Sequence, residues 1–328
     1  MLNAILNTLP QVLIDGLTLG SVYATIALGY TMVYGILELI NFAHGEIFMS
    51  GAFIGTGLLL VMTGFGWLGA MPAILALILV VVVAGVITGF LGMGIERVAY
   101  RPLRTAPKLI TLITAIGVSF LLQDIVRFIT ELRQGNYIVT GPSLFTDKVS
   151  IQASHLLPMF SDAQLKSSSI ILILIAIVMM ISLDFFVNRT KWGIAMRAVA
   201  LDRETASLMS INVNKVISLT FFIGSGLGGA TGVLFAMQYG TIDPYIGFIL
   251  GLKAFTAAVM GGIGNIRGAM VGGILLGILE MFAATNLTIF TGGLFGSEYK
   301  DVFAFIILIL ILIFKPEGIF GKAVTEKV

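Results

Sequence analysis

Long apolar runs separated by short polar segments dominate the sequence, and they constrain the fold more than any other feature. Of the 328 residues, 58% are hydrophobic and only 11% are charged, whereas a soluble domain carries about a quarter charged residues. A helix of about 20 apolar residues spans a bilayer. The pattern therefore predicts an all-α polytopic membrane protein with eight or nine transmembrane segments, in a single transmembrane domain over residues 1–328.

The seventh apolar run is short, so the sequence allows a broken or re-entrant segment there and leaves the count at eight or nine. The candidate spans are Gln11–Ile36, Glu46–Gly66, Met71–Gly94, Leu109–Thr130, Ser169–Val187, Val216–Gln238, Ile246–Gly261, Gly268–Leu287 and Tyr299–Phe314.

The basic residues predict the orientation, because cytoplasmic loops carry an excess of Lys and Arg. The loop Glu96–Lys108 holds four basic residues against one acidic residue, and Asn188–Lys215 holds five against two. Both are therefore expected in the cytoplasm. The intervening segment Glu131–Ser168 has balanced charge and is expected outside. Counting spans onward places the tail Lys315–Val328 inside, and counting back places the N-terminus outside.

The loop Asn188–Lys215 combines positive charge with helical periodicity. Trp192, Ala195, Met196 and Val199 recur at the spacing of one helix face, and the carboxylate of Asp202 is placed to cap a second helical turn. One interpretation is a solvated basic loop, and the other is a short helix that docks on a partner. The docking interpretation assigns contacts to Arg197, Ala198, Leu201, Asp202, Glu204, Ala206 and Leu208.

Two regions, Val33–Gly55 and Phe235–Gly262, each run from an apolar segment through a polar break into another apolar segment. By the predicted orientation the first break faces inward and the second outward. This is the arrangement of an inverted repeat in which broken helices line a transport pathway. The polar residues at the breaks are the candidates to line it: Asn41, His44, Glu46, Asp243 and Tyr245.

Glycines recur at four-residue spacing, which places flat strips on helix faces where another helix can pack closely. The strips serve packing within the subunit or at a subunit interface. One strip consists of Gly224, Gly228 and Gly232, and the other of Gly264, Gly268 and Gly272.

The chemistry that the sequence lacks also narrows its function. The chain has no cysteine and only two histidines, so no catalytic set and no metal site is expected, and no cofactor. Near the C-terminus, the stretch GIFGK lacks the spacing of a phosphate-binding loop. A net charge of +2 gives no reason to expect nucleic acid as a partner.

Several long blocks carry a resemblance to a known family. ALGYTMVYGILELINFAHGEIFM, MRAVALDRETASLMSINVNKVISLTFFIG, QYGTIDPYIGF and KAFTAAVMGGIGNIRGAMVGGILLGILE together resemble the LivH-type permease of branched-chain amino-acid ABC importers. Urea-type permeases are close relatives. The resemblance implies a second homologous permease subunit, two cytoplasmic ATP-binding subunits and an extracytoplasmic amino-acid-binding protein as partners, besides membrane lipid.

The same resemblance implies a location in the bacterial inner membrane and ATP hydrolysis in the separate partner subunits. It also implies that the block from Met196 to Met209 contacts the ATPase. Similar permeases carry glycine where this chain has Ser210, and glycine ends a helix in a left-handed turn without strain. With serine at this position, the sequence does not determine the residue at which the docking helix ends.

Alternatives from other classes remain at this point. A secondary transporter driven by an ion gradient would need ion ligands within the spans, and Asp15, Asp124 and Glu280 are available. A channel or a membrane scaffold would need no energy coupling. Co-purification with ATPase subunits separates the importer permease from all of these.

Overall fold

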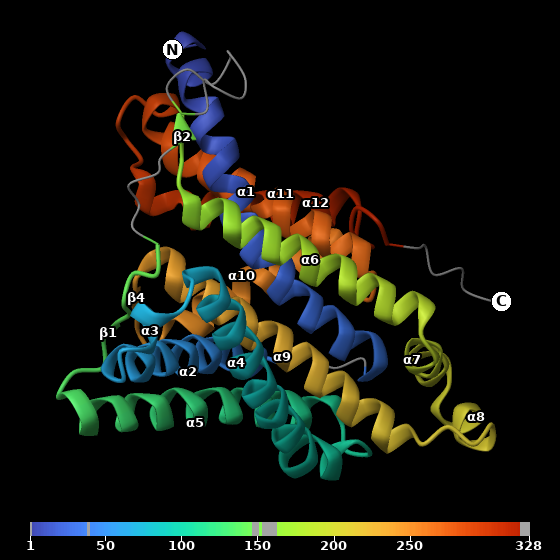
Figure 1. Cartoon of the computed structure of the whole chain (residues 1–328). Helices are drawn as coiled ribbons and strands as arrows, with labels where there is room; N and C mark the ends of the chain where they lie inside the picture. The colour runs from blue at the N-terminus through green and yellow to red at the C-terminus, as the bar shows by residue number, and fades with distance from the viewer. Residues whose placement is uncertain (1, 38–39, 146–150, 153–162, 322–328) are drawn as a thin grey trace. The chain divides into compact units, whose positions relative to one another are not determined.

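The computed structural model describes residues 2–37, 40–145, 151–152 and 163–321, and most of these residues are helical (Figure 1). The α-helices are α1 (Leu2–Leu37), α2 (His44–Gly64), α3 (Trp67–Ala70), α4 (Ala73–Ile95), α5 (Lys108–Gln134), α6 (Ser167–Arg189), α7 (Lys191–Leu201), α8 (Arg203–Leu208), α9 (Val213–Tyr239), α10 (Ile246–Gly261), α11 (Ile266–Phe290) and α12 (Lys300–Phe314). Two short helical segments, a π-helix at Glu96–Tyr100 and a 3-10 helix at Arg101–Leu103, prolong α4, and a 3-10 turn at Ser297–Tyr299 precedes α12.

Seven of the described helices are long and apolar enough to cross a membrane. The predicted seventh and ninth spans correspond to α10 and α12, which have 16 and 15 residues. At 1.5 Å per residue they reach only about 24 and 22 Å, against about 30 Å for the hydrocarbon core. The all-α membrane class is confirmed, whereas the count of eight or nine spans is not.

The chain divides into two compact units, which are Met1–Ala27 with Phe145–Val178 and Ala254–Val328, and Leu28–Leu144 with Met179–Lys253. In the first unit, α12 packs against α11, and the beginning of α1 approaches the backbone of α11 at Gly16 and Gly20. A side chain at Gly16 would lie 2.7 Å from the Cα atom of Ile278. The buried Glu280 carboxylate accepts a hydrogen bond from the Tyr23 hydroxyl at 2.8 Å and lies 3.5 Å from the Lys300 ammonium.

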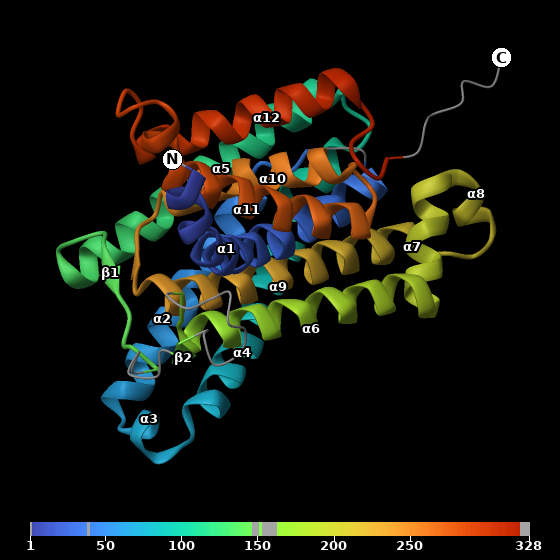
Figure 2. The same cartoon turned by 90° about the horizontal axis from the view of Figure 1, so that it is seen from above.

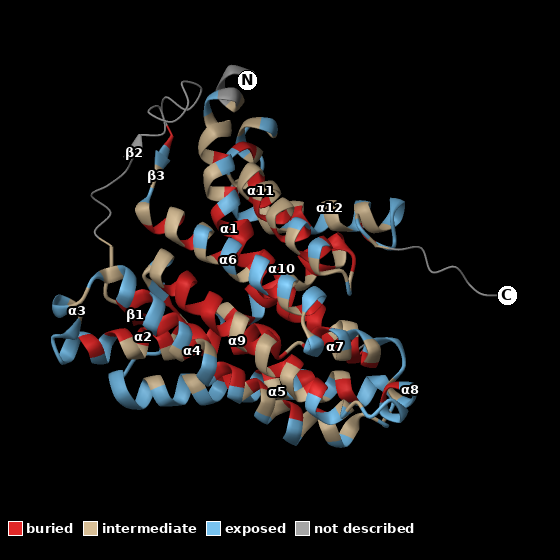
Figure 3. Cartoon of the chain, turned by 45° about the vertical axis from the view of Figure 1, so that its right-hand side comes forward, coloured by how far each residue is buried: buried red, intermediate tan, exposed pale blue. Residues whose placement is uncertain are grey.

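In the second unit, α9 forms the centre and packs against α2 and α4. Buried residues follow α9 along most of its length (Figure 3). Glycine permits the close crossing of α9 with α4, because a side chain at Gly85 would lie 3.2 Å from the Gly226 carbonyl oxygen. This close packing fixes the elements that carry the candidate site.

The short antiparallel pair of strands β1 (Val139–Thr140) and β4 (Thr241–Ile242) closes one end of the second unit. Val139 faces Ile242 in the register, and both join a small buried apolar cluster with residues of α2 and α9. A second short pair, β2 (Ile151–Gln152) with β3 (Gln164–Leu165), lies in the first unit.

Polar side chains and glycines mark the helix ends. The side-chain oxygens of Thr190, Asp202, Asn212 and Asn265 accept hydrogen bonds from the free backbone N–H groups at the starts of α7, α8, α9 and α11. Such caps satisfy donors that have no partner inside the helix. The loop between α6 and α9 is therefore two capped helices rather than an irregular chain.

Candidate functional site

The break between α1 and α2 gathers buried polar groups. The backbone N–H of His44 donates to the carbonyl of Asn41 at 3.0 Å, which closes the turn that begins α2. Asn41, His44 and Glu46 are all buried, as the first turn of α2 is throughout. Polar groups at membrane depth are costly and face protein or a water-filled path, so this cluster has a structural or transport role.

Glu46 is fully buried, and its carboxylate is only half satisfied. Its Oε1 atom accepts hydrogen bonds from the Ser119 hydroxyl at 3.1 Å and from the Gln123 amide at 2.8 Å, both on α5. Its Oε2 atom has no hydrogen-bond partner among the described residues. One carboxylate oxygen is therefore fixed by α5, and the other keeps an open acceptor.

Asn41 shows the same half-satisfied pattern. Its Oδ1 atom accepts a hydrogen bond of 2.6 Å from the Tyr100 hydroxyl, while its Nδ2 atom has no partner in the part of the chain that the structure describes. The ring of His44 meets the ring of Tyr30 edge-on, with centroids 4.8 Å apart. The site thus combines an open acceptor on Glu46 with an open donor on Asn41.

Glycines bring the start of α10 against the start of α2. A side chain at Gly247 would lie 2.5 Å from the Glu46 Oε2 atom and 2.7 Å from the Gly45 carbonyl oxygen. A side chain at Gly251 would lie 2.8 Å from the Cα atom of Gly45. The helix that follows the second polar break therefore contacts the helix that follows the first.

Asp243 and Tyr245 lie at the second break but apart from the buried cluster. The Asp243 carboxylate accepts a hydrogen bond from the backbone N–H of Tyr245 at 2.8 Å, which shapes the turn before α10. The Tyr245 side chain is exposed, and its hydroxyl accepts a bond of 3.5 Å from Arg127. Among the described residues, no three His, Asp or Glu side chains come together to hold a metal ion.

The glycine stripe of α9 faces the buried cluster. Gly228 lies against the ring of His44, Gly224 lies against Gly29 of α1, and a side chain at Gly232 would lie 2.6 Å from the backbone nitrogen of Ala52 in α2. These contacts lie within the second unit. Gly268 and Gly272 of α11 face Gly261 and Ala257 of α10, whereas Gly264 precedes α11 in a turn with φ of +88°, where an added side chain would meet no described atom within 4 Å.

The loop Asn188–Lys215 forms α7 and α8, which lie together near the start of α9 in both views (Figures 1 and 2). On α7, Met196 and Val199 are buried, and Arg197 donates to the carbonyl of Val187 at the end of α6. The predicted cap is confirmed, because Asp202 accepts from the N–H groups of Glu204 at 2.9 Å and Thr205 at 3.2 Å.

The exposed apolar residues of this loop lie at its turn and at its end. Leu201 is 88% exposed and Leu208 is 85% exposed, next to the exposed Met209. Of the other predicted contacts, Glu204 is exposed and Ala198 is half-buried. Ala206 is only 4% exposed, so it packs inside its own chain and is not presented to a partner.

α8 ends in a left-handed turn despite the serine. Ser210 has φ of 64° and is the one described non-glycine residue with a positive φ. The N–H of Ser210 bonds the carbonyl of Ser207, and the N–H of Ile211 bonds the carbonyl of Ala206, each at 3.1 Å. These two bonds are those of a Schellman motif, in which glycine usually holds the left-handed position.

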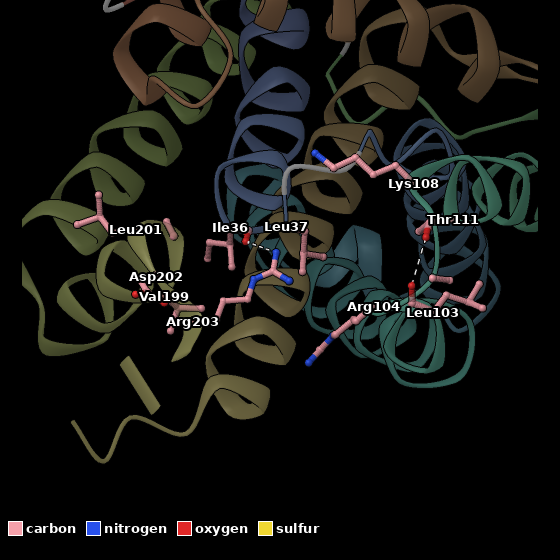
Figure 4. Close-up of a pocket in the computed structure, with 12 residues that line it drawn as sticks. Ile36, Leu37, Leu103, Arg104, Lys108, Thr111, Val199, Leu201, Asp202 and Arg203 are labelled. Carbon is pink, nitrogen blue, oxygen red and sulfur yellow. Dashed lines mark hydrogen bonds between the residues drawn. The ribbon is translucent and has the colours of Figure 1, made fainter. Parts of the chain in front are cut away.

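A cavity of about 350 Å³ lies beside α8, between this loop and the segment that follows α4 (Figure 4). Arg203 reaches into it and donates to the carbonyl of Ile36 at 2.9 Å. Arg104 approaches from the other side, where it pairs with the fully buried Glu96 and donates to Asn214 at 2.6 Å. Burial lowers the pKa of the Arg104 guanidinium, and the nearby Glu96 carboxylate opposes that shift.

Several residues of the site were not among the sequence predictions. Ser119 and Gln123 stand four residues apart on one face of α5. Tyr100, Glu96 and Ser218, whose hydroxyl donates to Glu96 at 2.6 Å, stand at span ends. The pairing of polar residues on one helix face was a usable signal for the first two, but nothing in the sequence connected them to Glu46.

Comparison with known proteins agrees with this membrane architecture. Residues 12–312 match the model of the family described as "Branched-chain amino acid transport system / permease component". The chain belongs to this family. No solved structure matches it.

Curated relatives of this family match almost the whole chain. It is 44% identical over 322 residues to the high-affinity branched-chain amino acid transport system permease protein LivH of Escherichia coli K12, with 97% of each chain covered. It is 43% identical over 318 residues to BraD of Pseudomonas aeruginosa, again covering 97% of each. A probable LivH of Methanocaldococcus jannaschii is 28% identical over 303 residues, with 90% of this chain and 87% of that protein covered.

These findings confirm that the chain is a multi-pass membrane permease of branched-chain amino-acid transport, and they confirm the predicted inner-membrane localisation.

Proposed function

We propose that the chain forms the translocation pathway for leucine, isoleucine and valine in an importer driven by ATP. The match of residues 12–312 to the branched-chain amino acid permease family carries this proposal. Two of the relatives are named as high-affinity permeases for branched-chain amino acids and are aligned over 97% of the chain. The match is far more extensive than the 33% of the chain that aligns with a fructose import permease.

The buried cluster at the first break is the proposed pathway lining. A zwitterionic amino acid needs an acceptor for its ammonium group and donors for its carboxylate. Glu46 offers an open acceptor at Oε2, and Asn41 offers an open donor at Nδ2. The N-terminal end of α2 adds the positive potential of the helix dipole at the same place. His44, Asp243 and Tyr245 complete the proposed lining.

The two polar breaks are also the basis for proposing an inverted repeat. Each break separates a long helix from a following helix, α1 from α2 and α9 from α10. The following helices touch at Gly45, Gly247 and Gly251. In an inverted repeat, such paired breaks from the two halves meet at the substrate.

We propose that α10 and α12 also cross the membrane, which gives nine spans and a cytoplasmic tail. One contact supports this topology. The backbone N–H groups of Ile319 and Phe320 bond the carbonyls of Met260 and Gly261 at 2.8 and 3.1 Å. The end of α10 therefore lies beside the tail, as expected if both are inside.

Because the chain has no cysteine, single cysteines at positions 136, 207 and 315 can test the topology. An impermeant thiol reagent applied outside is expected to label only the cysteine at position 136.

The partners follow from the permease role. The loop that carries α7 and α8 is the proposed docking segment for the ATPase, with two cytoplasmic ATP-binding subunits, a second permease subunit and an extracytoplasmic binding protein in the assembly. ATP hydrolysis takes place in those subunits, so this chain needs no catalytic residue. The exposed apolar side chains of Leu201 and Leu208 support this role, because a merely solvated loop has no use for them.

The test is uptake into proteoliposomes that contain the chain, its partner subunits and the binding protein. Labelled leucine is expected to accumulate only with ATP, and unlabelled isoleucine and valine are expected to compete. Accumulation of urea instead of leucine would show that urea is the substrate. Uptake that persists without ATP but collapses with an ionophore would show an ion-coupled transporter.

A further inference from the structure

A second groove lies in the same unit, beside the start of α9, with lining residues from α6, α7 and the segment that follows α4. It has a volume of about 710 Å³ and opens to the surface. Three cations line it, Arg97, Arg101 and Lys215, together with the exposed indole of Trp192. Its lining contains no acidic residue. We call it the cationic groove.

The cations of the groove have no counter-charge. Neither Arg97, Arg101 nor Lys215 makes an ion pair with any residue that the structure describes, in contrast to Arg104, which pairs with Glu96. Three like charges in one groove repel one another unless an anion lies between them. The groove is therefore complementary to a negatively charged group.

The deeper wall of the groove is apolar. It includes Phe186 at the end of α6 and Phe222 in the first turns of α9. Both belong to helices that are long and apolar enough to span the membrane. The groove thus places aromatic side chains at the end of the hydrocarbon region and cations just beyond it. Trp is typical of this interfacial depth, where one end of the ring is apolar and the other is hydrated.

We propose that the cationic groove binds an anionic phospholipid, with its phosphate between the three cations and an acyl chain along Phe186 and Phe222. Basic pockets between membrane helices recognise anionic head groups in this way. An acidic segment of a partner protein would match the cations but not the apolar wall at span depth. A zwitterionic lipid would match the wall but not the uncompensated charge.

The lipid would act on the docking loop, because Trp192 belongs to the first turn of α7 and Lys215 to the first turn of α9. A bound head group would join these two helix starts to Arg97 and Arg101 after α4. It would therefore stabilise the position of α7 and α8 in the resting protein.

The experiment measures lipid binding to the purified full-length chain, so it does not depend on transport or on the partner subunits. The chain is placed in nanodiscs of phosphatidylcholine, and spin-labelled phosphatidylglycerol or spin-labelled phosphatidylcholine is added at a low molar fraction. The immobilised fraction reports the relative affinity. Each cation near a membrane surface contributes roughly a fivefold factor in affinity for an anionic lipid.

The double variant Arg97→Gln/Arg101→Gln is expected to lower phosphatidylglycerol binding by more than about tenfold. The matched control, Arg189→Gln/Lys191→Gln, removes the same charge at the junction of α6 and α7 from residues that do not line the groove, and it is expected to bind as the unchanged chain does. The single variant Lys215→Gln gives an intermediate loss, which keeps the test valid if the double variant folds poorly.

Three results would overturn the proposal. The first is equal immobilisation of both lipids by the unchanged chain. The second is an equal loss in the groove variant and the control, which would reduce the effect to net charge. The third is displacement of the label by millimolar inorganic phosphate, which would show a site for a soluble anion rather than for a lipid.

Discussion

The turn that leads into α2 and the loop that carries α7 and α8 break the usual burial rule in opposite directions. At the start of α2, the polar side chains of Asn41 and Glu46 are buried among membrane helices. At the docking loop, the apolar side chains of Leu201 and Leu208 are exposed on a polar segment. In each region the residue type and its surroundings disagree, and folding alone gives no reason for either. We therefore propose that both regions serve binding.

The two regions also differ in how they are held. The α2 region is clamped by glycines that let helix backbones touch, so it tolerates little change. The proposed docking loop with α7 and α8 is held by caps and a few buried residues, and most of its residues are exposed (Figure 3). Substitutions are expected to affect folding in the first region and partner binding in the second.

The largest effect is expected from Gly232→Leu. Its side chain would overlap the backbone of α2 at Phe48 and Ala52, and overpacking of this kind costs about 3 kcal/mol or more. The yield of monodisperse protein in size-exclusion chromatography should collapse. Gly117→Leu is the matched control, because Gly117 lies in α5 with nothing near it. An equal loss in both variants would mean that the glycine stripe does not position α2.

A smaller loss is expected from Glu46→Leu. The substitution leaves the Ser119 hydroxyl and the Gln123 amide without their acceptor, at about 1–3 kcal/mol for each buried group. Thermal unfolding should shift downward, and leucine uptake should be lost.

Glu46→Gln separates these two effects, because its side-chain oxygen can still accept both hydrogen bonds. It should fold nearly normally and yet lose uptake, since the open carboxylate oxygen is replaced by an amide NH2 group, which donates hydrogen bonds and cannot accept an ammonium group. Normal uptake by Glu46→Gln would remove Glu46 from the proposed pathway.

The cap of α8 is expected to give a pH-dependent effect on stability that is confined to this helix. Hydrogen bonds from Thr205 lower the pKa of the exposed Asp202 carboxyl. The cap should therefore stabilise α8 at all pH values above the ordinary Asp pKa of about 4, and this contribution should fade as pH falls through the lowered value. Asp202→Ala should speed hydrogen exchange at the Thr205 amide severalfold at pH 7, whereas Asp202→Asn, which can still cap, should not.

The smallest effect is expected at Ser210. Its left-handed conformation costs a residue other than glycine about 1 kcal/mol, so Ser210→Gly should raise the free energy of unfolding by up to that amount. The same substitution at Ser207, inside α8, should lower it by about 0.5 kcal/mol. Chemical denaturation of both variants checks the sign, and destabilisation by Ser210→Gly would contradict the observed turn.

The sequence predicted the local features of both regions better than their contacts. Charge, apolar periodicity and an Asp before a helical turn were enough to predict a capped helix at Asp202. The break before α2 was also visible, because polar residues interrupt two apolar runs. These features depend on neighbours along the chain.

Contacts between distant segments could not be predicted in this way. The partners of Glu46 lie 73 and 77 residues away on α5, and spacing along the chain carries no information about them. Ala206 was expected to face a partner but is buried, because a helix of six residues is too short for periodicity to decide which face turns inward. Gly264 was expected on a helix with Gly268, although Asn265 caps that helix and so excludes Gly264. The preference of asparagine for the N-cap position was a usable sequence signal that this helix begins after Asn265.

The central claim is that ATP hydrolysis acts on this permease through the exposed leucines of the docking loop. The direct measurement is the amount of ATPase subunit that co-purifies with Leu208→Asp, together with ATP-driven leucine uptake. Leu208 is almost fully exposed, so the variant should fold normally, lose the ATPase and lose uptake. Ser207→Asp adds the same charge one residue earlier without removing an apolar contact, and it should keep both. Normal ATPase binding and uptake by Leu208→Asp would contradict the account.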